Sequence, residues 1–306
     1  MEVKNKNMAL YAVFQYKQRR ILDMVHSFLL IGQSNMAGRG FLKDVAPIHD
    51  ERIKMLRNGR WQVMAEPINY DRPFSGVGPA ASFALAWCRA YSGEIGLIPC
   101  ADGGSSLDEW APGGALFDHA VMQSRLAQRV SHIDGILWHQ GETDCPSEQI
   151  AVYEEKLKKI MAILRKALGL SDAPLLVGGL GDYLPGCTAH DYYANAPKLT
   201  EHLKHFAEVQ ENCFFVTAKG LSCNPDNLHF DAASQRIFGL RYFAAFYERR
   251  SVTAPLPNEK ELLAGLGNAL DSLPEKSFKS LKKQLDDGKI IKQEYDRQAD
   301  FLIRTL

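Results

Sequence analysis

The segment that decides the fold runs from Phe28 to Gly40 and reads F-L-L-I-G-Q-S-N-M-A-G-R-G. Its first four residues, Phe28 to Ile31, form an uninterrupted apolar run, which is typical of a strand buried on both faces of a parallel sheet. Gly32 ends this run, and the polar residues after it predict a turn from the strand into a helix. Ser34 therefore lies at the carboxyl end of a strand, which is the edge where open α/β sheets bind ligands.

This position alone leaves two interpretations of Ser34. Its hydroxyl can point into a crevice at the sheet edge, or Ser34 or Asn35 can cap the helix that follows. The stretch is not the G-x-S-x-G elbow of the α/β-hydrolases, because no glycine stands two positions after Ser34.

Further along the chain, apolar segments alternate with segments of helical character. The predicted strands after the first cover residues 94–99, 133–138, 174–178 and 213–218. The predicted helices cover residues 80–91, 117–130, 147–168, 198–210 and 231–249. A small hairpin is also expected over residues 52–64, around the favoured turn dipeptide Asn58-Gly59. About five strands that alternate with helices predict an α/β fold with a doubly wound parallel sheet.

Composition narrows the functional class. The chain has 306 residues, of which 46% are hydrophobic, so it can build one large domain plus an appendage. Because its 36 basic and 36 acidic side chains balance, we expect no nucleic-acid partner and no membrane surface. Six scattered cysteines without a C-x-x-C pair predict reduced core residues in a cytoplasmic protein, and neither a metal nor a cofactor is expected.

The two ends of the chain differ in character from the middle. Residues 1–23 are polar and are expected to form a leader outside the main domain, which covers residues 24–254. Pro255 and Pro257 mark a linker into a charged extension, residues 255–306, with leucines at helical spacing. Two helices joined near Gly288 are expected there. They can mediate a homo-oligomer, or they can form a solvated tail.

Four polar motifs each follow a predicted strand, and parallel strands end at one edge of their sheet. The motifs are Gly32-Gln33-Ser34-Asn35, Gly103-Gly104-Ser105-Ser106, His139-Gln140-Gly141-Glu142 and Asp226-Asn227-Leu228-His229. We therefore expect their side chains to meet at that edge.

These residue types suit nucleophilic catalysis. A serine hydroxyl is a weak nucleophile until a base takes its proton, and His229 is the candidate base for Ser34. Asp226 lies three residues before His229 and can hold the other ring nitrogen. The alternative is that His229 is a structural histidine near a helix start. Glu142 is an ambiguous acid, which can orient His229, bind substrate or hold the Ser34 loop.

An acyl-transfer reaction also needs donors for its oxyanion. The candidates are the backbone N–H groups of Ser34 and Gly104 and the side-chain amide of Gln140, although Gly103-Gly104 can also be a plain turn. Further candidates for substrate binding are neighbours of these groups, namely Gln33, Asn35, Ser105 and Trp110. An aromatic face suits a pyranose ring, but Trp110 can equally be a core residue.

Five motifs together resemble a known family. They are G-Q-S-N-M-A-G-R-G, G-V-G-P-A-A-S-F-A, G-G-S-S-L-D-E-W, W-H-Q-G-E-T-D and D-N-L-H-F, which lie in this order between about Val25 and Arg249. They resemble the sialate O-acetylesterase-like proteins of carbohydrate esterase family 6, in the SGNH hydrolase superfamily. The resemblance implies a three-layer flavodoxin-like fold and metal-independent removal of acetyl groups from an acetylated carbohydrate.

Residue by residue, the resemblance implies Ser34 as nucleophile, His229 as base and Asp226 or Glu142 as the acid. It also implies Gly104 and Gln140 in the oxyanion hole, with Gln140 in place of the asparagine usual in the superfamily. Members of the group act on xylan, sialic acid and other acetylated sugars. The alternatives are a carbohydrate-binding or scaffold protein on the same fold, and an esterase, lipase or thioesterase for non-sugar acyl esters.

Overall fold

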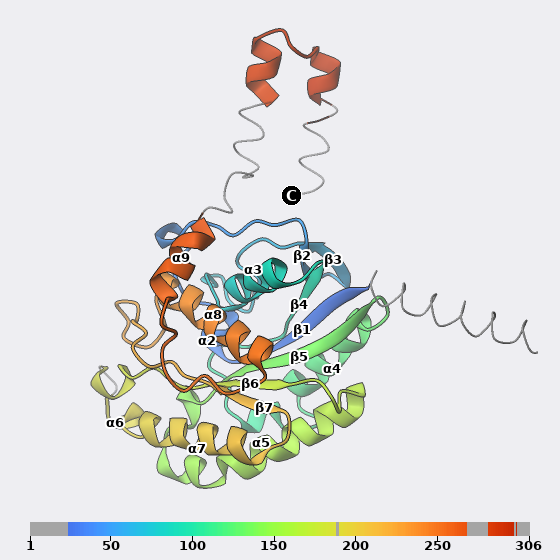
Figure 1. The fold of residues 1–306 in the computed structure, drawn as a ribbon. Coiled ribbons are helices and arrows are strands. Elements are labelled where there is room, and N and C mark those ends of the chain that lie inside the picture. The colour runs from blue at the N-terminus through green and yellow to red at the C-terminus, as the bar shows by residue number, and fades with distance from the viewer. Residues whose placement is uncertain (1–23, 188–189, 268–280, 297, 299–306) are drawn as a thin grey trace, which may run out of the picture.

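The computed structural model describes residues 24–187, 190–267, 281–296 and 298, and a seven-stranded sheet lies at the centre of this part (Figure 1). The strand order is β3-β2-β4-β1-β5-β6-β7. The strands are β1 (Val25–Gly32), β2 (Ile53–Arg57), β3 (Arg60–Val63), β4 (Ile95–Pro99), β5 (Ser131–His139), β6 (Leu175–Gly178) and β7 (Cys213–Val216). All neighbouring pairs are parallel except β2 and β3.

The five predicted parallel strands are confirmed, and the predicted hairpin is confirmed as β2 and β3. The hairpin joins the sheet as its edge, because β2 pairs in parallel with β4. The sheet therefore has seven strands instead of the five expected.

Helices cover both faces of the sheet and complete three layers (Figure 1). α3 (Ala80–Ala90) and α8 (Ala232–Glu248) pack on one face. α4 (Ala115–Ala127), α5 (Ser147–Leu168) and α7 (Ala196–Val209) pack on the other. The predicted helices are therefore confirmed. Asp231 caps α8, since its side chain accepts the backbone N–H of Ser234 at 2.7 Å.

β1 lies in the middle of the sheet because its apolar side chains pack into the core on both faces. Leu29 and Ile31 belong to the core cluster beneath α5, whereas Phe28 and Leu30 belong to the cluster beneath α3 and α8. None of the four side chains is more than 1% exposed. Burying a side chain of this size stabilises a fold by about 1.5–3 kcal/mol, so the run strongly favours the middle of the sheet.

The direction in which the sheet grows reverses beside β1. After β1, the chain forms β2, β3 and β4 on one side of it and then β5, β6 and β7 on the other. The connections that leave β1 and β5 therefore run in opposite directions from the carboxyl edge, which is the arrangement that places ligand sites in doubly wound sheets.

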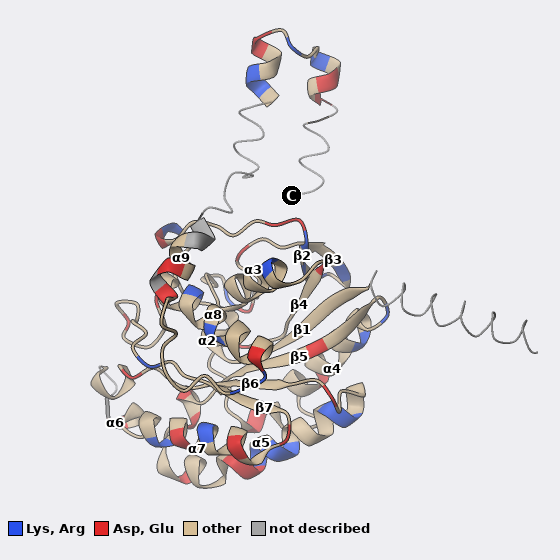
Figure 2. Ribbon diagram, in the orientation of Figure 1, with Lys and Arg blue, Asp and Glu red and all other residues tan. Residues whose placement is uncertain are grey.

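The predicted leader, residues 1–23, lies outside the described residues. In the predicted extension, α9 (Glu259–Gly267) packs against α8 through an ion pair in which Arg241 Nε donates to Glu259 Oε1 at 2.5 Å. Residues 281–286 and 292–296 are helical on either side of Gly288. Figure 2 shows basic and acidic residues interspersed along α5 and α7. Within the described ranges, no helix has the length and apolar character needed to cross a membrane.

Candidate active site

The turn after β1 fixes the position of Ser34. Gly32 has a φ of +130°, and a Cβ on it would lie only 2.0 Å from the backbone oxygen of His139, so this turn requires glycine. The N–H of Gln33 donates to that same oxygen at 2.8 Å, which ties the turn to the end of β5. Ser34 then begins the short helix α2 (Ser34–Ala37).

The Ser34 hydroxyl faces a histidine from the far end of the chain. Nε2 of His229 lies 3.0 Å from Oγ of Ser34, and Nδ1 of His229 lies 2.8 Å from Oδ2 of Asp226. The helix-cap interpretation of Ser34 is wrong, because α2 has no side-chain cap. The structure thus brings together the serine, imidazole and carboxylate that the motifs pointed to.

The loop after β7 holds Asp226 in place. Oδ1 of Asp226 accepts the backbone N–H groups of Leu228 and His229, both at 2.9 Å. Burial by itself would raise the pKa of Asp226, but the hydrogen bonds from the His229 backbone, the imidazole and Leu228 outweigh it and lower the pKa below its ordinary value. Asp226 therefore presents an ionised carboxylate to His229 across the neutral pH range.

Glu142 has a different partner. Its Oε1 accepts the side-chain amide of Asn35 at 2.6 Å, and Oδ1 of Asn35 accepts the backbone N–H of Phe230 at 3.0 Å. Among the described residues, Glu142 makes no hydrogen bond with His229, so the prediction that it orients this histidine is wrong. Glu142 is also only 1% exposed, so its side chain does not reach the protein surface. Of the three predicted roles, the geometry matches the one in which Glu142 holds the Ser34 loop.

Gly104 lies in the turn after β4, with a φ of +82° that favours glycine. Its carbonyl accepts the Thr143 hydroxyl at 3.2 Å, while its N–H has no hydrogen-bond partner in the described part of the chain. As the first residue of α2, Ser34 likewise has a backbone N–H without a partner inside its helix. Both backbone N–H groups therefore lack a partner in the described residues, and their role as oxyanion donors stays a prediction.

The side-chain amide of Gln140, in contrast, has no N–H left for a ligand oxygen. It is fully buried, and its amide Nε2 donates to the Ser105 carbonyl at 3.1 Å and to Oδ2 of Asp144 at 2.5 Å. Its Oε1 accepts the Tyr153 hydroxyl at 2.8 Å. Since both amide hydrogens have partners, the prediction of Gln140 as an oxyanion donor does not fit the structure, and Gln140 instead supports the turn after β4.

The four predicted substrate-binding side chains are also buried, and none is more than 3% exposed. Oε1 of Gln33 accepts the N–H of Gly141 at 3.2 Å. The Ser105 hydroxyl donates to the Asp102 carbonyl at 2.8 Å and accepts the Trp110 indole N–H at 3.0 Å. Trp110 packs edge-to-face on Trp138, so it is a core residue and does not offer its face to a sugar ring. These three side chains and Asn35 are buried beneath the site and do not reach the protein surface.

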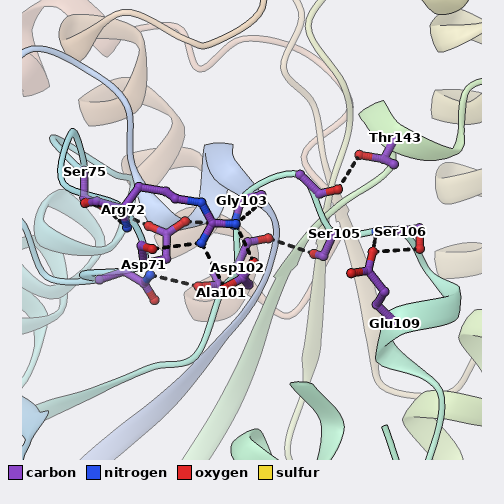
Figure 3. Close-up of polar contacts among 12 residues, drawn as sticks. Asp71, Arg72, Ser75, Ala101, Asp102, Gly103, Ser105, Ser106, Glu109 and Thr143 are labelled. Carbon is purple, nitrogen blue, oxygen red and sulfur yellow. Dashed lines mark hydrogen bonds and ion pairs between the residues drawn. The ribbon is translucent and has the colours of Figure 1, made fainter. Parts of the chain in front are cut away.

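A network of ion pairs that was not predicted from the sequence also holds the turn after β4, on the side opposite Gln140 and Thr143 (Figure 3). Arg39 and Asp71 form a two-pronged ion pair with a shortest separation of 2.6 Å, and their side chains are only 4% and 3% exposed. Oδ2 of Asp71 also accepts the N–H of Gly103 at 2.8 Å. Arg72 donates to Oδ1 of Asp102 at 3.0 Å and to the Gly103 carbonyl at 2.8 Å.

One signal for this network was present in the sequence. Arg39 lies between two glycines directly after the nucleophile motif, where a long charged side chain needs a partner. Nothing local to Asp71 identifies it as that partner, because 32 residues separate the two.

Potential metal ligands are dispersed over the described part of the chain. Within the described residues, no three His, Cys, Asp or Glu side chains gather as a metal-binding group. All six cysteines are free thiols, and five of them are buried, which agrees with their prediction as reduced core residues.

Solved structures share the fold of this chain. The crystal structure of an Arabidopsis thaliana protein matches with a TM-score of 0.66 and 28% identity, over 74% of this chain and 98% of the other. The crystal structure of NanS matches with a TM-score of 0.59 and 20% identity, over 74% and 98% of the two chains. A carbohydrate acetylesterase from Xanthomonas citri matches with a TM-score of 0.51 and 17% identity, over 72% and 55%.

Sequence comparison identifies the family. A probable carbohydrate esterase of Arabidopsis thaliana is 30% identical over 243 residues, which cover 72% of this chain and 89% of that protein. The family model described as carbohydrate esterase, sialic acid-specific acetylesterase matches residues 24–248, which is most of the chain and includes all four polar motifs. With this match and the serine, histidine and aspartate at one sheet edge, the chain belongs to the sialic acid-specific acetylesterase family of carbohydrate esterases.

Proposed function

We propose that this chain is a serine esterase that removes O-acetyl groups from a carbohydrate through an acyl-enzyme. The observation that carries the proposal is the pair of contacts around His229, which lies 3.0 Å from the Ser34 hydroxyl oxygen and 2.8 Å from the Asp226 carboxylate. This is the geometry in which a histidine takes a proton from a serine while a carboxylate holds its tautomer. Family membership supports acetylated carbohydrate as the substrate class.

In the first half of the reaction, Oγ of Ser34 attacks the acetyl carbonyl carbon as its proton passes to Nε2 of His229. The carbonyl oxygen becomes an oxyanion, and the N–H groups of Ser34 and Gly104 stabilise its charge. The bond from carbon to the sugar oxygen then breaks. His229 gives its proton to the departing sugar oxygen, which leaves an acetylated Ser34.

In the second half, a water molecule replaces the sugar. His229 accepts a proton from the water as the water oxygen attacks the acetyl carbon, and the bond to Oγ of Ser34 breaks. The proton returns to Oγ, and acetate leaves. Asp226 balances the positive charge that His229 carries in both halves.

The test compares the wild-type protein with Ser34→Ala on two substrates, p-nitrophenyl acetate and an O-acetylated sugar. We expect the substitution to reduce kcat by several orders of magnitude, on the order of 10⁶-fold as in a comparable triad. A serine-directed phosphonate should also label the wild-type protein and fail to label the variant. Mass spectrometry of the labelled peptide identifies Ser34.

Each alternative function gives a different result. A Ser34→Ala protein with the wild-type rate would refute the serine mechanism, and a wild-type protein that binds acetylated sugars without turnover would be a binding protein. An enzyme that hydrolyses p-nitrophenyl acetate but no acetylated sugar would be an esterase for other short acyl esters. Ser106→Ala, which removes an exposed hydroxyl after the same turn, is the matched control and should keep the wild-type rate.

A further inference from the structure

A surface pocket with a volume of about 270 Å³ lies beside the turn after β4. One wall is the end of β4 and the residues that follow it, from Pro99 to Asp102. The opposite wall is the segment from Asn69 to Asp71, and Leu116 and His119 of α4 close the third side. None of the acyl-transfer steps described above uses this pocket.

The pocket is close to Ser34. β4 is the direct neighbour of β1, and Cys100 and Asp102 donate their N–H groups to the carbonyls of Leu30 and Gly32 at 2.9 and 3.0 Å. Neighbouring strands lie about 4.8 Å apart, so the pocket wall is roughly one strand spacing from the segment that carries Ser34. Gly103 and Gly104 follow Asp102 directly, and Gly104 is a proposed oxyanion donor, so this turn connects the pocket wall with the proposed acyl position. A ligand that spans this turn would reach both places.

Two exposed aromatic rings lie on this part of the chain, Tyr70 within the wall formed by Asn69 to Asp71 and Phe74 shortly after it. Tyr70 is 70% exposed, and Phe74 is 69% exposed with the Arg39 guanidinium 5.3 Å above its ring centre. Between them, Asp71 accepts the N–H of Gly103 (Figure 3) and pairs with Arg39, so the aromatic rings project from an anchored segment. Exposed aromatic side chains on an anchored segment beside a pocket are typical of a binding surface.

The polar groups of the pocket suit a neutral, hydroxyl-bearing ligand. Both of its carboxylates are paired with guanidinium groups, Asp71 with Arg39 and Asp102 with Arg72. The Asp102 side chain remains 34% exposed, and His119 is exposed as well, so both can hydrogen-bond to hydroxyl groups. Because the charges are matched, the pocket offers no unpaired charge to an ionic ligand.

From this combination we infer that the pocket binds a second, neutral sugar ring of the substrate, with Tyr70 as the platform for the apolar face of that ring. The inference rests on the proposed function and makes the substrate class narrower: an acetylated sugar that carries a neighbouring neutral ring, instead of an acetylated monosaccharide. The acetylated ring lies over Ser34, and its neighbour lies across the Gly103-Gly104 turn against Tyr70.

The experiment measures KM and kcat for matched substrate pairs with the wild-type protein, Tyr70→Ala and Tyr70→Phe. One pair is O-acetylated xylose and O-acetylated xylobiose, and another is O-acetylated N-acetylneuraminic acid and the same sugar linked to lactose. For at least one pair, the wild-type KM should be lower for the longer substrate. Tyr70→Ala should raise that KM roughly three- to tenfold, as expected for the loss of an aromatic contact, and leave kcat on p-nitrophenyl acetate unchanged.

Tyr70→Phe keeps the ring and should retain the wild-type KM. Tyr247→Ala is the matched control, since Tyr247 is a 56% exposed aromatic residue near the end of α8, away from the pocket. Equal KM values for short and long substrates in every pair, or a Tyr70→Ala protein that keeps the wild-type preference, would overturn the inference. A general loss of activity on p-nitrophenyl acetate in Tyr70→Ala would also overturn it, because Tyr70 would then support the acyl site itself.

Failure of the proposed function would look different. In that case the wild-type protein would hydrolyse no acetylated sugar of either length, or Ser34→Ala would keep its activity. Failure of the inference alone leaves sugar deacetylation and its dependence on Ser34 intact and removes only the preference for the longer substrate.

Discussion

At the scale of single residues, two carboxylates lie near the reacting groups and differ in their surroundings. The Asp226 side chain is 47% exposed and contacts the imidazole directly. Glu142 is buried and acts on the site only through Asn35, which in turn accepts the N–H of Phe230, the residue after His229. We therefore propose that Asp226 orients His229, and that Glu142 holds together the segments that carry Ser34 and His229.

Asp226→Asn tests the first role. The amide keeps the size of the side chain but removes the charge that fixes the histidine tautomer, so we expect kcat on p-nitrophenyl acetate to fall on the order of 10³- to 10⁴-fold. Stability should change little, because the side chain is half-exposed, and this can be measured by urea unfolding. Activity within a few-fold of wild type would show that another group orients His229.

Glu142→Gln and Glu142→Ala test the second role. Glutamine keeps an oxygen that can accept the Asn35 amide, so this variant should retain kcat within about tenfold of wild type. Alanine leaves the buried Asn35 amide without its partner, which should lower the free energy of unfolding by about 1–3 kcal/mol. If Glu142→Gln instead lost as much activity as Asp226→Asn at wild-type stability, Glu142 would have to act on the chemistry itself.

At the scale of elements, the site is built from turns at strand ends, and each turn is held by side chains from elsewhere. The turn after β4 has Gln140 and Thr143 on one side and Asp71 and Arg72 on the other. The Gly104 N–H can bind an oxyanion only if this turn keeps its shape. The ion pair of Asp71 and Arg39 therefore supports the turn that carries the proposed oxyanion donor.

Asp71→Asn tests this support. It leaves the buried Arg39 guanidinium without its counter-charge, which should lower the free energy of unfolding by about 3–5 kcal/mol in urea denaturation at pH 7. Asp108→Asn is the control: Asp108 pairs with Lys156 at the surface, and its loss should cost no more than about 1 kcal/mol.

The effect of Asp71→Asn should also depend on pH. Burial favours the neutral form of Asp71, but hydrogen bonds from Arg39, Ser75 and Gly103 outweigh this, so its pKa in the folded protein lies below the ordinary value of 3.8. A lowered folded-state pKa gives stability that is complete above the ordinary value and is lost as the pH falls toward the folded-state value. The stability gap between wild type and Asp71→Asn should stay constant from pH 7 to 5 and shrink below about pH 4. A gap that widened on acidification would contradict this sign.

At the scale of the whole molecule, the first helix of the predicted extension packs on the predicted main domain. Arg241 of α8 is 1% exposed, and its guanidinium donates to both carboxylate oxygens of Glu259 in α9. Leu262 and Leu263 also pack against the core cluster beneath α8. A truncation at residue 255 would leave Arg241 without its buried counter-charge, so it would disturb the domain and the extension together.

A chain that ends after Gly267 keeps α9 and removes only residues 268–306. We expect this truncation to reduce the solution mass measured by light scattering to that of a monomer, since leucines at helical spacing in the removed part are the predicted means of self-association. Its kcat on p-nitrophenyl acetate should equal that of the full chain, because the site lies in residues 33–230. An unchanged mass at equal protein concentration would contradict oligomerisation through these helices.

Local patterns in the sequence were enough to determine the elements and the edge at which they meet. The apolar run at Phe28 to Ile31 and the alternation of strands and helices predict the parallel sheet, because they depend on burial at a period set within each element. Parallel strands end together, so the motifs of Ser34 and His229 could be expected at one edge.

Only the tertiary structure decided which polar groups are free for chemistry. Gln140, Trp110 and Glu142 carry suitable groups in suitable motifs, yet each is buried against partners that come from other elements, such as Tyr153, Trp138 and Asn35. The pairing of Asp71 with Arg39 and the addition of the hairpin to the sheet edge were equally invisible in the sequence. The physical reason is that periodicity reports how one element meets the core, whereas a hydrogen bond depends on which distant group reaches the same donor or acceptor.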